Sequence, residues 1–112
     1  MHELALTQAI VEAVLQRAEE AGGRRVARVV VQIGRLTAVL PAAVHFCFEL
    51  CAADTLLAGA ALVIEQPPGT ARCRSCGAQV ALADLLSLCS CGSSDLAWLS
   101  GHELQIREME MI

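Results

Sequence analysis

Apolar residues recur at helical spacing between residues 4 and 21 of the chain. Leu6, Ile10 and Val14 fall on one side, whereas the opposite side carries glutamates and a glutamine. A repeat of three to four residues is typical of an amphipathic helix with one buried face. Gly22 and Gly23 follow directly, so we expect the helix to end there.

The segment 24–34 is rich in β-branched residues, which favour strands. Apolar side chains occur at both alternating sets of positions, so we expect a strand that is partly covered on both faces. One predicted face holds Ala27, Val29, Val31 and Ile33, and the other holds Val26, Arg28, Val30 and Gln32.

A second helix is expected at residues 41–53. Pro41 suits its first position, because the amide that proline lacks would have no helical partner there. Residues 54–59 are expected to turn the chain. The predicted core stripe of this helix consists of Val44, Cys47, Phe48 and Cys51.

Residues 61–66 alternate in the manner of a strand, with Leu62 and Ile64 directed inward. The sequence Pro-Pro-Gly at 67–69 then predicts a sharp boundary.

The last stretch, 101–112, also predicts a strand. Leu104 and Ile106 share one alternating face, but Met109 and Met111 fall on the other. A bulge near Arg107 and Glu108 would reconcile these two sets, so we expect an irregular strand.

These elements predict an α+β fold, with a small mixed three-stranded sheet and two α-helices. Residues 1–69 and 101–112 would form one α/β domain, and residues 70–100 would form an inserted lobe that resembles a zinc ribbon. A lobe of this size cannot bury enough apolar surface to fold unaided, so it needs a metal or another cross-link.

Composition narrows the class of protein. The 112 residues are 55% hydrophobic, but no run reaches the roughly 20 apolar residues of a membrane-spanning helix. We see no signal peptide, and therefore expect the cytoplasm and no membrane partner. The net charge of −4 argues against a sequence-independent nucleic-acid binder.

Four of the six cysteines form two close pairs: Cys73 with Cys76, and Cys89 with Cys91. In a cytoplasmic chain such pairs are more typical of metal ligands than of disulfides. Four thiolates suit Zn²⁺ and leave no open coordination position, so we expect a structural zinc site. The second pair has one residue fewer between its cysteines, which predicts a tighter turn with fewer amide–sulfur hydrogen bonds.

Alternatives for this quartet remain at the level of sequence. They are free thiols or disulfides in a loop, an iron–sulfur or rubredoxin-type iron centre, and a redox dithiol.

The tripeptide Met1-His2-Glu3 brings an α-amine, backbone amides and an imidazole together. These nitrogens can close chelate rings around one ion, and nitrogen-rich tetragonal sites suit Ni(II) or Cu(II). Met1 should be retained, because its removal generally requires a small second residue. The amine and the imidazole titrate near neutral pH, so metal uptake there would be reversible and sensitive to acid.

Each of the other candidate residues could have either a purely structural role or a functional one. His45 is expected as an exposed helical residue, and Cys47 and Cys51 as small buried residues, although the three could form a soft metal site. His102 is either a surface residue or a further nickel ligand beside His2. The arginines at 24, 25 and 28 are either solvated or a docking patch for an acidic partner.

Taken together, the segments MHELALTQAIVEAV, VVVQIGRLTAVLPAAVHFCFEL, DTLLAGAALVIEQPPGTARCRSCG and CGSSDLAWLSGHELQIREMEM resemble the HypA/HybF family of hydrogenase-maturation nickel chaperones. The resemblance runs essentially from end to end. It implies Ni(II) binding at Met1, His2 and Glu3, and structural zinc at Cys73, Cys76, Cys89 and Cys91. The family usually has Cys-x-x-Cys in its second pair, and Cys89-Ser90-Cys91 departs from that pattern.

The resemblance further implies delivery of nickel to the large-subunit precursor of [NiFe]-hydrogenase, together with a nickel-insertion GTPase. It also implies a contribution to urease in some organisms, and occasional homodimers. We therefore hypothesise a nickel metallochaperone rather than an enzyme. The alternative is a zinc-ribbon module for protein or nucleic-acid interaction that has no role in nickel handling.

Overall fold

The computed structural model describes residues 3–112 and has an α+β fold. The chain divides into two compact units: residues 1–31, 39–64 and 105–112 form the first, and residues 32–38 and 65–104 form the second. Met1 and His2, which the sequence predicts as nickel ligands, lie outside the described residues. None of the helices within residues 3–112 is both long and apolar enough to cross a lipid bilayer.

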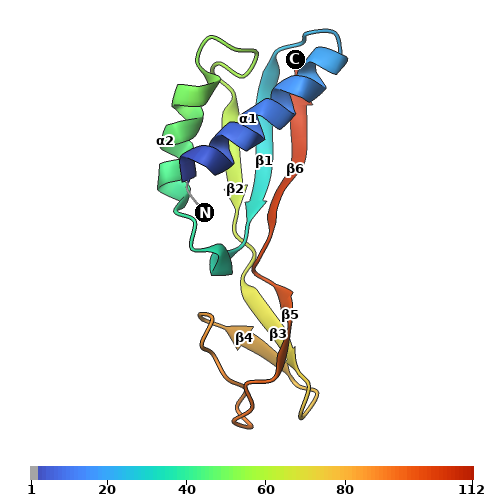
Figure 1. The fold of residues 1–112 in the computed structure, drawn as a ribbon. Coiled ribbons are helices and arrows are strands. Elements are labelled where there is room, and N and C mark those ends of the chain that lie inside the picture. Colours follow the sequence, from blue (N-terminus) through green and yellow to red (C-terminus); the bar gives the residue numbers. More distant parts are fainter. Residues whose placement is uncertain (1–2) are drawn as a thin grey trace. The chain divides into compact units, whose positions relative to one another are not determined.

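The first unit contains two helices on a three-stranded sheet with the strand order β2-β1-β6 (Figure 1). In Figure 1, β1 and β2 run in the same direction and β6 runs opposite to them, so the sheet is mixed as predicted. The elements of this unit are α1 (Glu3–Glu20), β1 (Val26–Ile33), α2 (Pro41–Ala52), β2 (Ala61–Glu65) and β6 (Leu104–Met111).

Helix α1 ends where its sequence predicts. The amide of Gly23 donates to the carbonyl of Ala18, and the amide of Gly22 donates to that of Glu19, each at 3.0 Å. Both glycines have positive φ angles, which are 97° at Gly22 and 78° at Gly23. These paired hydrogen bonds form a Schellman motif, which satisfies carbonyl groups that the helix leaves open.

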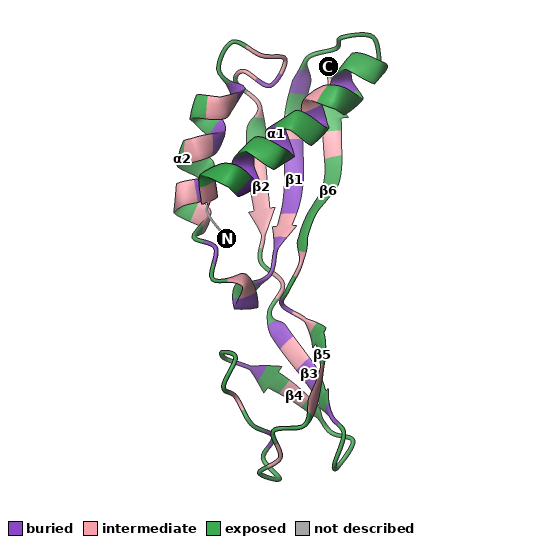
Figure 2. Ribbon diagram, in the orientation of Figure 1, coloured by how far each residue is buried: buried purple, intermediate pink, exposed green. Residues whose placement is uncertain are grey.

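The core of the first unit lies between the helices and the central strand β1. Figure 2 shows β1 buried over most of its length, and the buried side of α1 turned toward the sheet. The largest fully buried hydrophobic side chains of this unit are aliphatic, as the scarcity of aromatic residues requires: Val14, Val26, Val29, Val30, Val31, Val44 and Leu57.

One predicted core stripe was wrong in detail. Helix α2 buries Val44, Phe48 and Ala52, whereas Cys47 and Cys51 are half-buried. The buried stripe is therefore rotated toward Ala52. The outer side of the helix is also apolar, since Phe46 and Leu50 are more than half exposed, so hydrophobic periodicity alone could not fix which side packs.

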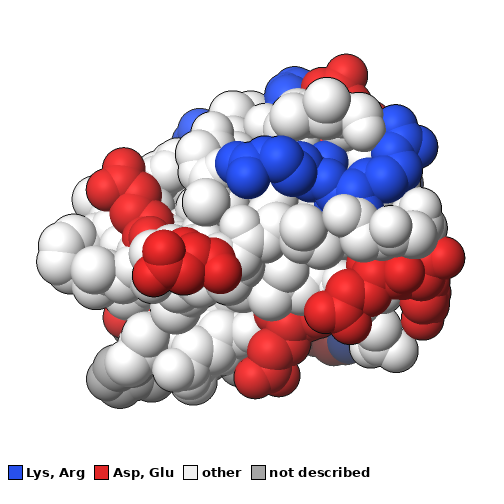
Figure 3. All heavy atoms as spheres, turned by 90° about the horizontal axis from the view of Figure 1, so that it is seen from above, with Lys and Arg blue, Asp and Glu red and all other residues white. Residues whose placement is uncertain are grey.

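The arginines near the start of β1 make hydrogen bonds or ion pairs within the first unit. Arg24 Nε donates to the carbonyl oxygen of Ile112 at 2.9 Å, and Arg25 donates to that of Ala58 at the same distance. Arg28 pairs with Glu108 at 3.3 Å. Viewed from above, basic side chains gather in one area of this face, with acidic side chains beside it (Figure 3). These contacts give the arginines a structural role in holding the chain end and a loop.

The second unit contains a three-stranded antiparallel sheet with the order β4-β3-β5. Its strands are β3 (Gly69–Cys73), β4 (Gln79–Leu82) and β5 (Leu96–Ser100), and the unit also holds the short 3₁₀ helix η1 (Arg35–Thr37). The sequence predicted the lobe but none of these three strands. Its small core consists of Leu36, Ala71 and Leu82, with Val80 and Leu96 packed against it.

Three glycines let backbone segments of the second unit approach closely. A Cβ added at Gly34 would fall on the carbonyl group of Gly101, and one added at Gly101 would lie 2.7 Å from the Cα atom of Gly69. Leu36 packs against this crossing, since a Cβ at Gly69 would lie 2.8 Å from its side chain. No larger residue fits at Gly34 or Gly101 without backbone movement, whereas at Gly69 the side chain of Leu36 would have to move.

Candidate metal centre

The four predicted cysteine ligands converge in the second unit. The Sγ atoms of Cys73, Cys76, Cys89 and Cys91 all lie within 4.8 Å of one another. Within residues 3–112 it is the only group of three or more metal-binding side chains so arranged. All six cysteines, each of them in the described part of the chain, are free thiols.

The sulfur–sulfur distances fit a tetrahedral zinc site. Cys73 Sγ lies 3.7 Å from Cys91 Sγ, and Cys76 Sγ lies 3.6 Å from Cys89 Sγ. A zinc–sulfur bond of about 2.3 Å implies edges of about 3.8 Å in a regular ZnS₄ tetrahedron. The sulfurs are too far apart for disulfides, whose S–S bond is about 2.05 Å. The donor set therefore suits one zinc ion held by both cysteine turns.

The first cysteine turn directs backbone amides at its sulfurs. The amides of Cys76 and Ser75 donate to the sulfur of Cys73 and lower the pKa of that thiol to about 6, although burial acts in the opposite direction. The turn closes through the amide of Gly77, which donates to the carbonyl of Cys73 at 2.8 Å. Gly77 has a φ of 79°, a conformation that favours glycine.

The second turn is shorter but is built in the same way. The amide of Gly92 donates to the carbonyl of Cys89 at 2.8 Å, and Gly92 has a φ of 89°. The second turn thus has one residue fewer between its cysteines than the first, but a glycine still follows its second cysteine. The tight spacing therefore leaves the sulfur positions compatible with zinc.

The neighbouring sulfurs raise the pKa values of Cys91 and Cys76. At Cys91 the amide of Ser93 lowers the pKa, but the neighbouring sulfurs of Cys89 and Cys73 raise it to about 11. At Cys76 the amide of Ala78 lowers the pKa, yet Cys89 and Cys73 again shift it upward. A cluster that loses its first proton easily and its last with difficulty suits a divalent cation, which neutralises the crowded negative charge.

Contacts that the sequence did not predict join the two cysteine turns. Arg74 pairs with Asp95 at 2.9 Å, and its amide donates to the carbonyl of Asp95 at 3.0 Å. The hydroxyls of Ser75 and Ser93 lie 3.0 Å apart. The sequence gives one sign of these contacts: the first turn contains an arginine and a serine, and the second turn is followed by a serine and an aspartate.

Of the tripeptide Met1-His2-Glu3, only Glu3 is described. It is the first residue of α1; its carbonyl accepts from the Thr7 hydroxyl at 2.7 Å, and its carboxylate accepts from the amide of Leu40 at 3.2 Å. Leu40 precedes the first turn of α2, so this carboxylate connects the starts of the two helices. The Glu3 carboxylate thus has a structural partner at the start of α2.

The other histidines are separate from the cysteine cluster. His45 is exposed on α2, and the described residues show no metal-binding group that joins it to Cys47 and Cys51. His102 is exposed and stacks on Trp98, with the ring centroids 4.2 Å apart and the planes at 8°. Its role as an additional nickel ligand stays a prediction.

A family model and two sequence relatives agree on the family. The family model described as "Hydrogenase/urease nickel incorporation, metallochaperone, hypA" matches residues 1–111. The chain is 47% identical over 111 residues to a "Hydrogenase maturation factor HypA" from Nostoc sp., which covers 99% of this chain and 96% of that protein. A protein of the same name from Geobacter metallireducens is 45% identical over 112 residues, with 99% of each chain covered.

Two solved structures share the fold. The solution structure of the Ni metallochaperone HypA from Helicobacter pylori has a TM-score of 0.69 at 23% identity, and covers 100% of this chain and 98% of its own. A second solution structure, of a HypA protein, has a TM-score of 0.71 at 24% identity, with 100% and 97% covered.

Proposed function

The chain belongs to the HypA family, and on that premise we propose that it is a nickel metallochaperone for hydrogenase maturation that binds Ni(II) at its first residues. The observation that carries the proposal is the family match itself, which includes Met1, His2 and Glu3. The α-amine of Met1, the imidazole of His2 and the backbone amides of His2 and Glu3 supply the nitrogens. Such a nitrogen-rich set suits the tetragonal geometry of Ni(II).

The charge and protonation of these groups make nickel a cargo that can be released. The amine and the imidazole must lose protons to bind, and their usual pKa values lie near 8 and 6.5. Affinity therefore falls as the pH drops through this range. A transient carrier benefits from a site that binds nickel near neutral pH and releases it when the ligands are protonated or displaced.

The cysteine quartet has a different task in this proposal. Cys73, Cys76, Cys89 and Cys91 would hold zinc, which would cross-link the two turns of the small lobe. Support comes from the sulfur separations of 3.6 and 3.7 Å and from the lobe's small core. With four protein ligands, the zinc keeps no position for substrate, so this site stabilises the fold and performs no chemistry.

The cargo would pass to the large-subunit precursor of [NiFe]-hydrogenase, with a nickel-insertion GTPase as partner. Urease is a second recipient that the family description includes. Homodimers and the cytoplasm as the compartment are further parts of the proposal that rest on the sequence.

The decisive experiment is calorimetric titration of Ni(II) into zinc-loaded protein whose native amino terminus is verified by intact mass. We expect His2→Ala to weaken nickel binding by at least about tenfold, equivalent to about 1.4 kcal/mol. His45→Ala is the matched control, because His45 is exposed on α2 and should leave the affinity unchanged. Equal affinity in the wild-type and His2→Ala proteins would remove the proposed site.

Acetylation of the α-amine is an independent arm of the same experiment. It removes a ligand without changing any side chain, so nickel should be lost while zinc remains at one equivalent. Retention of nickel by the acetylated protein would contradict the role of the Met1 amine.

A further inference from the structure

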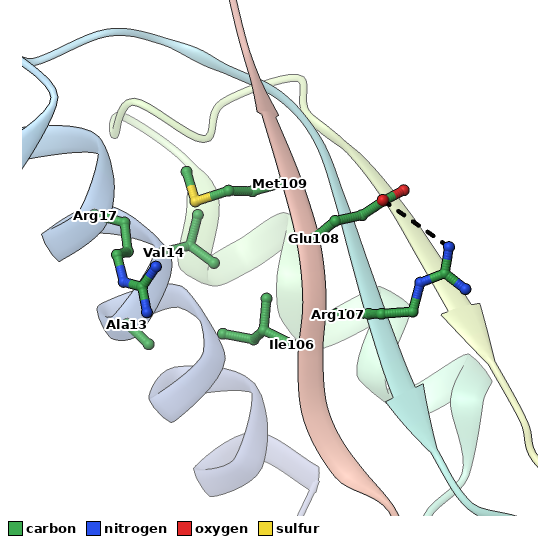
Figure 4. A pocket seen from close by; sticks show the side chains of 7 residues that line it. All are labelled: Ala13, Val14, Arg17, Ile106, Arg107, Glu108 and Met109. Atoms are coloured by element: carbon green, nitrogen blue, oxygen red, sulfur yellow. Dashed lines mark ion pairs between the residues drawn. The ribbon is translucent and has the colours of Figure 1, made fainter.

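A pocket lined by both apolar and charged residues opens between α1 and the edge strand β6, wholly within the first unit. It has a volume of about 180 Å³ and is lined by Ala13, Val14, Arg17 and residues 106–109. Figure 4 shows Val14, Ile106 and Met109 directed into the space between the helix and the strand. A cavity of about 150 Å³ accepts a benzene ring in other proteins, so this pocket has room for one medium-sized apolar side chain.

The irregularity of β6 creates this pocket. Ile106 and Met109 are three residues apart and would face opposite sides of a regular strand. Figure 4 shows both of them pointing toward α1, whereas Arg107 and Glu108 point to the other side. This arrangement agrees with the bulge predicted near Arg107–Glu108, and it places two apolar side chains on the pocket side.

A guanidinium without a partner lies at the mouth of the pocket. The side chain of Arg17 extends along α1 toward Ala13 and Ile106 (Figure 4), and makes no hydrogen bond or ion pair with any residue in the described part of the chain. The acidic residue of the pocket lining, Glu108, does not serve it. Glu108 pairs instead with Arg28 at 3.3 Å and with Arg107 at 3.9 Å on the other side of the strand.

The pocket thus combines apolar walls with one unpaired cation. Arg17 is exposed, and an arginine can bind a carboxylate through two parallel hydrogen bonds. The complementary ligand carries a carboxylate and an apolar group a short distance apart.

Strand β6 also determines the shape of that ligand. It is an outer strand of the β2-β1-β6 sheet, so one side of its backbone has no neighbouring strand within residues 3–112. An extended segment can lie along such an edge. The bulge and the charges at Arg107, Glu108 and Glu110 discourage indiscriminate strand pairing, so recognition depends on the pocket and on Arg17.

We propose that the α1–β6 groove is a docking site for an extended segment of a partner protein that presents an acidic side chain and, two residues away, a leucine-sized apolar side chain. Residues two apart share a face of an extended chain. The carboxylate therefore reaches Arg17 while the apolar side chain enters the pocket. The site is independent of the proposed nickel and zinc ligands.

The test uses the full-length, zinc-loaded protein and short threonine-based peptides whose ends are acetylated and amidated. One peptide carries Glu and Leu two positions apart, a second has the reverse order, and control peptides replace Glu by Gln or Leu by Ala. Binding is followed by NMR chemical-shift titration. We expect shifts at the pocket residues, and the better Glu/Leu peptide should bind at least about fivefold more tightly than either of its controls.

Variants locate the two halves of the recognition. Arg17→Gln should abolish the preference for Glu over Gln but keep that for Leu over Ala. Ala13→Trp should block binding, since Ala13 is exposed at the pocket and the larger ring would fill it. Arg107→Gln is the matched control; its side chain points away from the pocket (Figure 4), and affinity should not change.

Several results would overturn the proposal. These are an absence of shifts at the pocket, a preference for Glu that survives Arg17→Gln, and an effect of Arg107→Gln as large as that of Arg17→Gln. Hexanoate that binds as tightly as the peptide would identify a small-molecule site instead. Shifts at the pocket that depend on protein concentration without peptide would identify a second copy of the chain as the occupant.

Discussion

Glu3 makes a structural contact through its side chain, and we propose a separate metal-binding role for its backbone amide. Its carboxylate accepts a hydrogen bond from the amide of Leu40, while its own amide lies at the open amino end of α1. Helices leave their first amides without partners. The side chain and the backbone of Glu3 therefore have different consequences when they are changed.

We predict that Glu3→Ala lowers the free energy of unfolding by about 0.5–1.5 kcal/mol, since one hydrogen bond between the helix starts is lost. Nickel affinity should stay within about twofold of the wild type, because the backbone amide remains. Chemical denaturation and calorimetry measure the two effects. A large loss of nickel affinity would instead assign the carboxylate as the ligand.

In metal-free protein whose cysteine turns remain folded, Cys73 and Cys91 are predicted to titrate far apart. Amide donation lowers the pKa of Cys73 to about 6, whereas crowding by neighbouring sulfurs raises that of Cys91 to about 11. Because the lowered pKa favours the thiolate, the stabilisation from Cys73 is present above its unfolded pKa and is lost as the pH falls through about 6.

The measurement is the pH dependence of iodoacetamide labelling at each cysteine, read by mass spectrometry. The midpoint for Cys73 should lie near 6, and that for Cys91 should lie above the range of an ordinary thiol. Midpoints are compared rather than rates, since Cys73 is buried and Cys91 is exposed. Equal midpoints for both thiols would show that the turns do not persist without metal.

At this scale the sequence predicted that four cysteines would form one group, but not the burial of the other two. Cysteine spacing is a local property, so the grouping of Cys73, Cys76, Cys89 and Cys91 could be predicted from the chain alone. Burial of Cys47 and Cys51 depends on which side of α2 meets the sheet. That helix is apolar on several sides, with Phe46 and Leu50 exposed, so its sequence does not decide the question.

Among the elements, the two cysteine turns depend on glycines with positive φ. Gly92 has a φ of 89°, and a Cβ added there would meet no atom within 4 Å. The cost of replacing it is therefore conformational rather than steric.

We predict that Gly92→Ala weakens zinc binding by about 5- to 30-fold, which corresponds to about 1–2 kcal/mol of backbone strain. Competition with a chromogenic chelator measures the affinity. Gly59→Ala is the matched control, because Gly59 has a similar φ of 78° with open space around it but lies in the first unit. Zinc binding that weakens equally in both variants would rule out a local effect.

Long periodic elements were predictable, and short strands of the lobe were not. Helix α1 and strand β1 have enough apolar positions to reveal their spacing. Strands β3, β4 and β5 span only four or five residues each, and their burial patterns are irregular. Their pairing is fixed by the cysteine turns and by tertiary contacts such as those of Leu36, which comes from a distant part of the sequence.

For the whole molecule, the two units differ in how they are stabilised. The first has an extensive aliphatic core around β1, whereas the core of the second is centred on Leu36, Ala71 and Leu82. A core this small contributes little free energy, so the second unit should depend on its metal.

We predict that removal of zinc by a chelator exposes the amides of β3, β4 and β5 to hydrogen exchange, with rates that rise by about two orders of magnitude. Amides of α1 and β1 should keep most of their protection. Exchange followed by NMR or mass spectrometry distinguishes the two regions. Simultaneous loss of protection in both units would show that they unfold as one cooperative body.

Both sheets recruit an outer strand from the last part of the chain: β6 pairs with β1, and β5 pairs with β3. A cut in the exposed turn at Leu85–Leu86 would leave β1 and β3 on one fragment, and β5 and β6 on the other. The two fragments would then stay associated through strand pairing, without a covalent link. Each fragment would supply the strands that the other needs to complete its sheets.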